Sequence, residues 1–179
     1  MEEEYGEPEG EEPEVEQHGE VEIGGATSPI EYLRRRRKEI GEDRTLDLDI
    51  PGYEGILVCR YQRLDWDELK KITDKASKSK NPRRELIAHC DVLIKACQQF
   101  MIRKDGQLEP INNAYPEVGE EPVKYDQRLA AIFDVSLSAG QGARTVVLAL
   151  FNNDVAVTAH QGELVEWLST SNAEDDAGF

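Results

Sequence analysis

The side chains that most often carry chemistry are few and scattered in this chain. The three histidines are His18, His89 and His160, and none has a His or Cys partner at the spacing of zinc ligands. Two of the three cysteines, Cys90 and Cys97, would lie two turns apart on one helix, about 10 Å along its axis, which is too far for one disulfide or one metal ion. We therefore expect no metal site and interpret these residues as surface or packing residues.

No group of residues predicts catalysis. His160 and Glu163 would share one helix face, but the spacing places neither a nucleophile nor a second carboxylate beside them. The glycine-rich sequence 139–143 precedes an expected helix, but it lacks the Lys-Ser/Thr ending of a P-loop and the glycine spacing of a dinucleotide site. We expect a protein that is not an enzyme, with no catalytic residue and no cofactor.

Charge is the clearest compositional feature of the chain. The first 24 residues contain eleven Glu and no Lys or Arg, so they carry -11 of the formal net charge of -16. Because this segment also lacks the large apolar residues that a core needs, we predict a disordered acidic tail over residues 1–27. A short acidic tail is predicted over residues 172–179, and residues 28–171 are enough for a single domain.

A basic run lies near the start of that domain. Ser28 and Pro29 are typical of a helix N-terminus, and the helix that they predict carries five consecutive bases, Arg34, Arg35, Arg36, Arg37 and Lys38. We predict that this run binds a partner, although a solvated helix face is the simpler interpretation. A protein partner is expected rather than a nucleic acid, because the acidic tail would compete for the bases and repel phosphates.

Neither a membrane span nor export is expected. The longest apolar run, Val146–Phe151, is far shorter than the roughly 20 residues that cross a bilayer. The acidic N-terminus differs from a secretory signal, and three cysteines do not form the even set of a disulfide framework. The sequence predicts a reducing cytoplasm.

The fold class that we predict is mainly α (α+β). A small helical domain would carry one β-hairpin in its N-terminal part, around residues 45–63, and would follow the disordered acidic tail. One strand is expected over 45–50, where apolar and polar residues alternate, and the other over 56–61, where residues that favour strands follow one another. Helices are expected at 66–76, 82–104, 125–134, 143–151 and 155–168, with an extended loop or ragged hairpin over 107–122. For 143–151 a buried strand is the alternative, because Thr145, Val146 and Val147 are β-branched. The 82–104 helix would organise the core through Leu86, Cys90, Leu93, Cys97 and Phe100.

The order of these elements resembles a known family. A basic amphipathic helix is followed by sequence segments that are similar to tail assembly chaperones of long-tailed bacteriophages infecting actinobacteria. The similarity extends over roughly residues 28–172 and leaves the acidic tail outside. It is carried by Thr45–Tyr53, Leu57–Tyr61, Leu64–Trp66, Asp91–Cys97, Tyr125–Ala130, Ala143–Val147 and Trp167–Leu168.

The resemblance implies a binding protein that acts without turnover. Members of this family are implied to bind the tape measure protein in the host cytoplasm, keep its long apolar helices soluble, and assist assembly of the tail tube protein around it. The alternative is a virion structural protein of the neck or tail, such as a completion or connector protein. A third class is an acidic decoy for a DNA-binding protein, but most of the excess charge lies on the tail. Self-association is left open.

Overall fold

The computed structural model describes residues 30, 31, 33–35 and 44–176, with side chains up to residue 170. The chain divides into two compact units, Met1–Arg37 and Lys38–Phe179. In the first unit, the described residues are helical and exposed, which agrees with the helix predicted to begin after Ser28. The predicted acidic tail, residues 1–27, lies outside the described residues.

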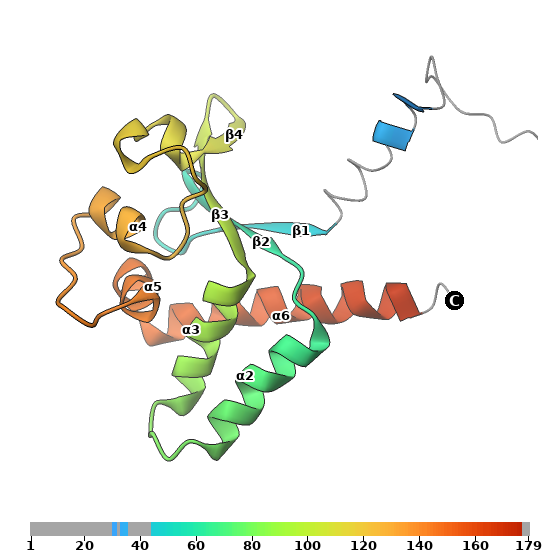
Figure 1. Cartoon of the computed structure of the whole chain (residues 1–179), viewed down its shortest axis with the longest axis vertical. Helices are drawn as coiled ribbons and strands as arrows, with labels where there is room; N and C mark the ends of the chain where they lie inside the picture. Colours follow the sequence, from blue (N-terminus) through green and yellow to red (C-terminus); the bar gives the residue numbers. More distant parts are fainter. Residues whose placement is uncertain (1–29, 32, 36–43, 177–179) are drawn as a thin grey trace, which may run out of the picture. The chain divides into compact units, whose positions relative to one another are not determined.

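The second unit contains an antiparallel sheet of four strands in the order β1-β2-β3-β4 (Figure 1). The strands are β1 (Thr45–Asp49), β2 (Leu57–Gln62), β3 (Cys97–Lys104) and β4 (Gln107–Pro110). The pairing of β1 with β2 confirms the predicted hairpin. Across this pair, Arg60 donates two hydrogen bonds of 2.7 Å to the carboxylate of Asp47, which fixes the register on the polar face.

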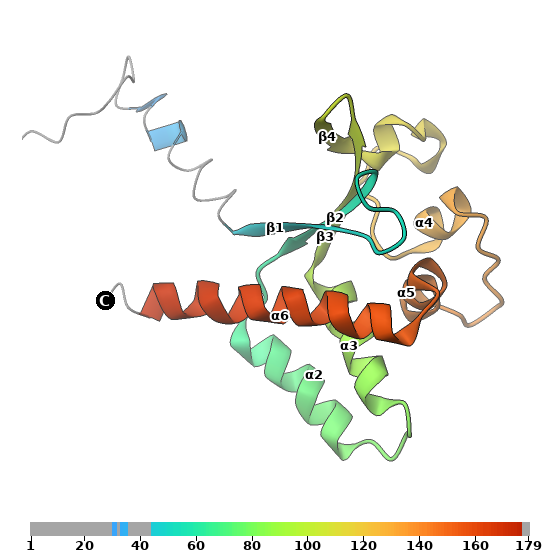
Figure 2. The same cartoon turned by 180° about the vertical axis from the view of Figure 1, so that it is seen from behind.

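Helices complete an α+β fold. They are α2 (Trp66–Lys78), α3 (Arg84–Ala96), α4 (Gln127–Ile132), α5 (Ala143–Phe151) and α6 (Asp154–Asp176), with short 3₁₀ turns η1 (Ile111–Asn113) and η2 (Pro116–Val118). Helices α2 and α3 form a helical hairpin between β2 and β3, and α6 crosses beside it (Figures 1 and 2). Asp126 caps α4 by accepting hydrogen bonds from the backbone N–H groups of Arg128 and Leu129.

The long central helix predicted over 82–104 is wrong in its second half. The helix ends at Ala96, and Cys97 has φ -59° and ψ 115°, which turns the chain into strand β3. Apolar residues at Cys97, Phe100 and Met101 fit either helical spacing or a twisted strand, so periodicity does not separate the two. Pairing of β3 with both β2 and β4 supplies the backbone hydrogen bonds that a helix would otherwise provide.

Two further boundaries differ from those predicted. In the segment 107–122, where an extended loop or ragged hairpin was predicted, strand β4 pairs with β3 and is followed by the turns η1 and η2, so the sheet has four strands where one hairpin was predicted. Helix α6 continues to Asp176, so residues 172–176 of the predicted C-terminal tail are helical.

One apolar core joins the sheet to the helices. Leu93 of α3, Phe100 of β3, Val147 of α5 and Leu164 of α6 have no exposed surface and belong to one cluster. The ring of Phe100 meets that of Tyr125 edge to face, with centroids 4.9 Å apart. Helix α3 therefore does organise the core, although it is shorter than predicted.

Candidate functional site

Helix α2 is the least embedded of the long helices. All of its residues are described, and none is fully buried. It rests on its neighbours through the half-buried side chains of Leu69, Ile72 and Ala76, and the ammonium of Lys95 on α3 pairs with Glu68 at 2.9 Å. Because α2 contacts its neighbours only through partly buried side chains, apolar surface stays accessible along both of its sides.

On one side of α2 lies a groove of about 400 Å³, which we call the α2 groove. Its floor is small and apolar: Ala76 of α2, Ala88 and Val92 of α3, and Val165 of α6. The other residues that line it are Leu69, Thr73, Ser77, Arg84, Glu85, His89 and Gln161. Small floor residues allow another backbone or a large side chain to approach closely, and the polar groups lie among them.

An exposed aromatic residue lies on the same helix as the α2 groove. Trp66, the first residue of α2, is 65% exposed. It precedes Leu69 by three residues and Thr73 by seven, so helical geometry places all three on one face of α2. Leu69 and Thr73 line the groove, so an exposed aromatic residue lies on the face of α2 that borders it. Exposed tryptophans are common anchors of protein interfaces.

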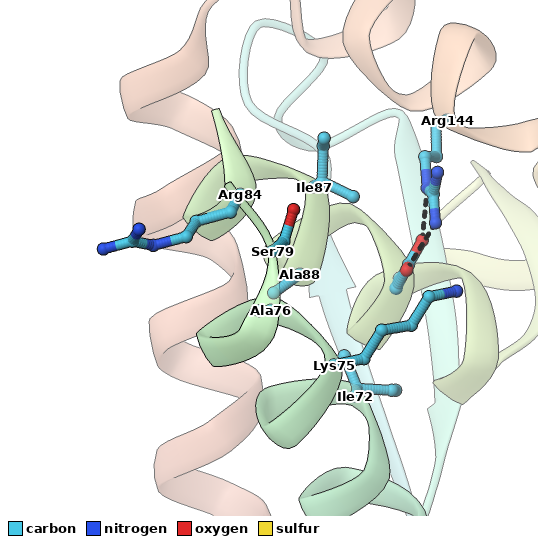
Figure 3. Close-up of a pocket in the computed structure, with 9 residues that line it drawn as sticks. Ile72, Lys75, Ala76, Ser79, Arg84, Ile87, Ala88 and Arg144 are labelled. Carbon is cyan, nitrogen blue, oxygen red and sulfur yellow. Dashed lines mark hydrogen bonds and ion pairs between the residues drawn. The ribbon is translucent and has the colours of Figure 1, made fainter. Parts of the chain in front are cut away.

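A smaller pocket of about 180 Å³ lies on the other side of α2 (Figure 3). Arg144 of α5 donates two hydrogen bonds, of 2.5 Å and 2.6 Å, to the carboxylate of Asp91 on α3. Lys75 extends toward this ion pair, whereas Arg84 extends away from it (Figure 3). Asp91 neutralises Arg144, which leaves Lys75 and Arg84 as the other charged residues that line the pocket.

The imidazole at the edge of the α2 groove is not arranged for catalysis. The hydroxyl of Thr158 donates its single proton to the carbonyl of Asp154 at 3.0 Å. It therefore accepts the 3.2 Å hydrogen bond from Nδ1 of His89, and the imidazole does not act as its base. Burial lowers the pKa of His89, against the opposing effect of the nearby Glu85 carboxylate.

Another polar cluster, formed by Tyr61, Tyr125 and His160, is buried. The hydroxyl of Tyr61 on β2 lies 2.7 Å from that of Tyr125 and 2.9 Å from Nε2 of His160 on α6. Burial lowers the pKa of His160 to about 4 and raises the pKa of both phenols well above their ordinary value. Glu163 is exposed, so the acid-base pair considered from the sequence does not form, and His160 has a structural role.

Four of the predicted partner-binding residues, Arg34 to Arg37, belong to the first unit, and Lys38 belongs to the second. Arg34 and Arg35 are helical and exposed, whereas Arg36, Arg37 and Lys38 lie outside the described residues. Further along, several bases of the second unit are ion-paired: Arg60 with Asp47, Arg83 with Asp154, Lys95 with Glu68 and Arg103 with Asp49. This pairing reduces the positive surface available to a polyanion.

Sequence reasoning missed the main features of the site. The α2 groove combines residues from three helices that are far apart in the chain, and its only local signal is the amphipathic pattern of α2. The approach of Cys59 to Cys97, 3.5 Å between their sulfur atoms, was missed because Cys97 was placed on a helix.

The described part of the chain offers neither a metal site nor a membrane span. No group of three or more His, Cys, Asp or Glu side chains among them could hold a metal ion. Likewise, no described helix combines the length and apolar character needed to cross a membrane.

Comparison with known proteins found no similar protein. No family model, no curated protein and no solved structure matches the chain.

Proposed function

We propose that this chain is a helix-binding assembly chaperone of the phage tail type, acting in the host cytoplasm without catalysis. Its client would be the tape measure protein, with the tail tube protein as a further partner. The observation that carries the proposal is the α2 groove, an open apolar channel between three helices of a well-packed domain. The phage assignment itself rests on the sequence resemblance.

The α2 groove has the dimensions to bind the apolar stripe of a client helix. Along α3 it extends from Arg84 to Val92, about 12 Å at the rise of an α-helix. That length covers roughly two turns and would receive three apolar side chains at positions i, i+3 or i+4, and i+7 of a client. Trp66 would contact the client at one end, and the small side chains of Ala76 and Ala88 would allow close approach of its backbone.

A chaperone of this kind needs many weak and reversible contacts. A groove of two turns gives modest affinity for any one segment, which suits a long client that must later be released to the tube. The net charge of -16 would keep such a complex from aggregating while apolar client helices are covered.

Co-expression with the phage's own tape measure protein tests the proposal. We expect the tape measure protein to move into the soluble fraction and to copurify with this chain. Mass spectrometry of purified mature particles should detect at most traces of the chain. A ring-like stoichiometry in finished virions, with no effect on tape measure solubility, would overturn the chaperone function and favour a structural protein of the neck or tail.

A further inference from the structure

Two thiols meet at the centre of the sheet. Cys59 lies on β2 and Cys97 is the first residue of the neighbouring strand β3. Their sulfur atoms are 3.5 Å apart, and the exposed fractions of the two residues are 0% and 1%. A disulfide has a sulfur–sulfur distance of about 2.0 Å, so bond formation requires the two sulfur atoms to approach each other further. Cys59 pairs with Phe100 and Cys97 with Tyr61, so the two cysteines are diagonal neighbours on adjacent strands.

The positions of Cys59 and Cys97 in the chain determine which elements a bond between them would enclose. Cys59 precedes the helical hairpin of α2 and α3, and Cys97 directly follows the last residue of α3, Ala96. Cys59 therefore lies within the strand that leads into the hairpin, and Cys97 lies where the hairpin returns to the sheet. A bond between them would close a covalent ring that contains both helices and two walls of the α2 groove.

We propose that Cys59 and Cys97 form a redox-active dithiol that closes to an intramolecular cross-strand disulfide when the chain meets a peroxide. One thiolate attacks the peroxide, the O–O bond breaks, and a sulfenic acid and hydroxide form. The second thiol then attacks that sulfur and water leaves. In total, two thiols are oxidised to one disulfide and one hydrogen peroxide is reduced to two molecules of water.

Proximity decides the product, because Cys59 and Cys97 are the two thiols whose sulfur atoms lie 3.5 Å apart. Burial raises the pKa of Cys59 well above its ordinary value, and the phenols of Tyr61 and Tyr125 offset this only in part. Burial likewise raises the pKa of Cys90, to about 11. Both are therefore protonated at neutral pH and react slowly. Once Cys59 or Cys97 is oxidised, its partner lies within reach.

A peptide map of the oxidised full chain is a direct test. The three cysteines fall on three separate tryptic peptides, 45–60, 85–95 and 96–103. After treatment of the reduced protein with a few equivalents of hydrogen peroxide and alkylation under denaturing conditions, we expect peptides 45–60 and 96–103 to be disulfide-linked. Peptide 85–95 should carry an alkylated Cys90, and the intact mass should fall by two hydrogen atoms.

The variant Cys90→Ala is the matched control, since it removes a buried cysteine outside the pair. It should form the linked peptide to the same extent as the parent chain, whereas Cys59→Ala should form none. The thermal unfolding midpoint of the oxidised parent should rise above that of the reduced parent, and reduction should reverse the shift.

Several outcomes would overturn the proposal. One is oxidation of Cys90 at the same rate as the pair, and another is a disulfide between two chains. Addition of oxygen atoms to Cys59 or Cys97 with no linked peptide would also refute it. These results come from the parent chain, so they remain decisive even if a cysteine variant fails to fold. They are also independent of whether the α2 groove binds a client.

Discussion

The hydroxyl of Tyr61 lies 2.9 Å from Nε2 of His160, and this contact joins the second strand of the sheet to helix α6. A neutral imidazole that accepts here lets Tyr61 donate to it and accept in turn from Tyr125, 2.7 Å away. The ring of His160 also meets that of Phe151 edge to face, with centroids 5.0 Å apart. These neighbours surround His160 with groups that do not compensate a positive charge.

Folding stability should therefore fall as the pH drops through the titration range of His160. Its pKa is about 4 in the folded chain and 6.5 in the unfolded chain, so the unfolded state binds more protons between these values. The contribution of His160 to the free energy of unfolding is fully present above about pH 6.5 and decreases as the pH falls toward 4. The total loss is on the order of 3 kcal/mol. Urea unfolding at several pH values measures the slope.

Two variants distinguish the contribution of His160 to stability at low pH from that of His89, the other described histidine. His160→Gln should flatten the decrease between pH 6.5 and pH 4. His89→Gln should leave most of it, because His89 is only half-buried and the Glu85 carboxylate opposes the lowering of its pKa. An unchanged slope in His160→Gln would show that another group controls acid stability.

The core role of α3 is tested by Leu93→Ala. Leu93 has no exposed surface and contacts the cluster that joins the sheet to the helices. Removing most of its side chain should lower the free energy of unfolding by roughly 2 to 5 kcal/mol. Val155→Ala on α6 is the control, since Val155 is 72% exposed, and it should change stability by less than about 0.5 kcal/mol. Equal denaturant midpoints for the two variants would contradict this core.

Helix α2 should open more readily than α3. It has no fully buried residue, whereas α3 buries Ala88, Cys90, Val92, Leu93 and Ala96. Amide hydrogens of α2 should exchange through a local opening, while those of α3, β2 and β3 should exchange only on global unfolding. Hydrogen exchange followed by mass spectrometry would measure the difference. Equal protection of both helices would show that the hairpin opens as one unit.

The sequence predicted those parts of the fold that depend on local signals. The β1–β2 hairpin, α2, α5 and the start of α6 agree with apolar periodicity and turn residues. The strand β3 could not be predicted in this way, because Cys97 and Phe100 continue the apolar spacing of α3 and only pairing with distant residues makes the segment a strand.

The candidate site was harder to predict than the fold. The α2 groove depends on how α6 packs beside α2 and α3, and no spacing within one helix reports that. Trp66 and Leu69 lie one turn apart on α2, yet Trp66 is exposed whereas Leu69 packs against the core, and apolar type alone does not separate the two. The partner-binding role of Arg34 and Arg35 stays a prediction.

The final prediction tests the α2 groove with one charge. Thr73 lines the groove, is exposed, and donates to the carbonyls of Leu69 and Lys70, at 3.3 Å and 3.0 Å. Thr73→Glu would place a carboxylate where the apolar stripe of a client helix should lie, which costs binding energy because the charge would be desolvated. We expect the variant to fold as the parent does and to recover less than about a tenth of the soluble tape measure protein, as a loss of 1.4 kcal/mol or more implies.

Ser169→Glu is the matched control for this change. Ser169 is an exposed hydroxyl residue of α6 that bonds back to the carbonyl of Val165 at 2.8 Å, as Thr73 does to that of Leu69, but it does not line the groove. It adds the same charge to a helix, so it should leave client recovery unchanged. Equal recovery with both variants would exclude the α2 groove as the client site. Equal losses with both would instead show that added negative charge, rather than the groove, limits binding.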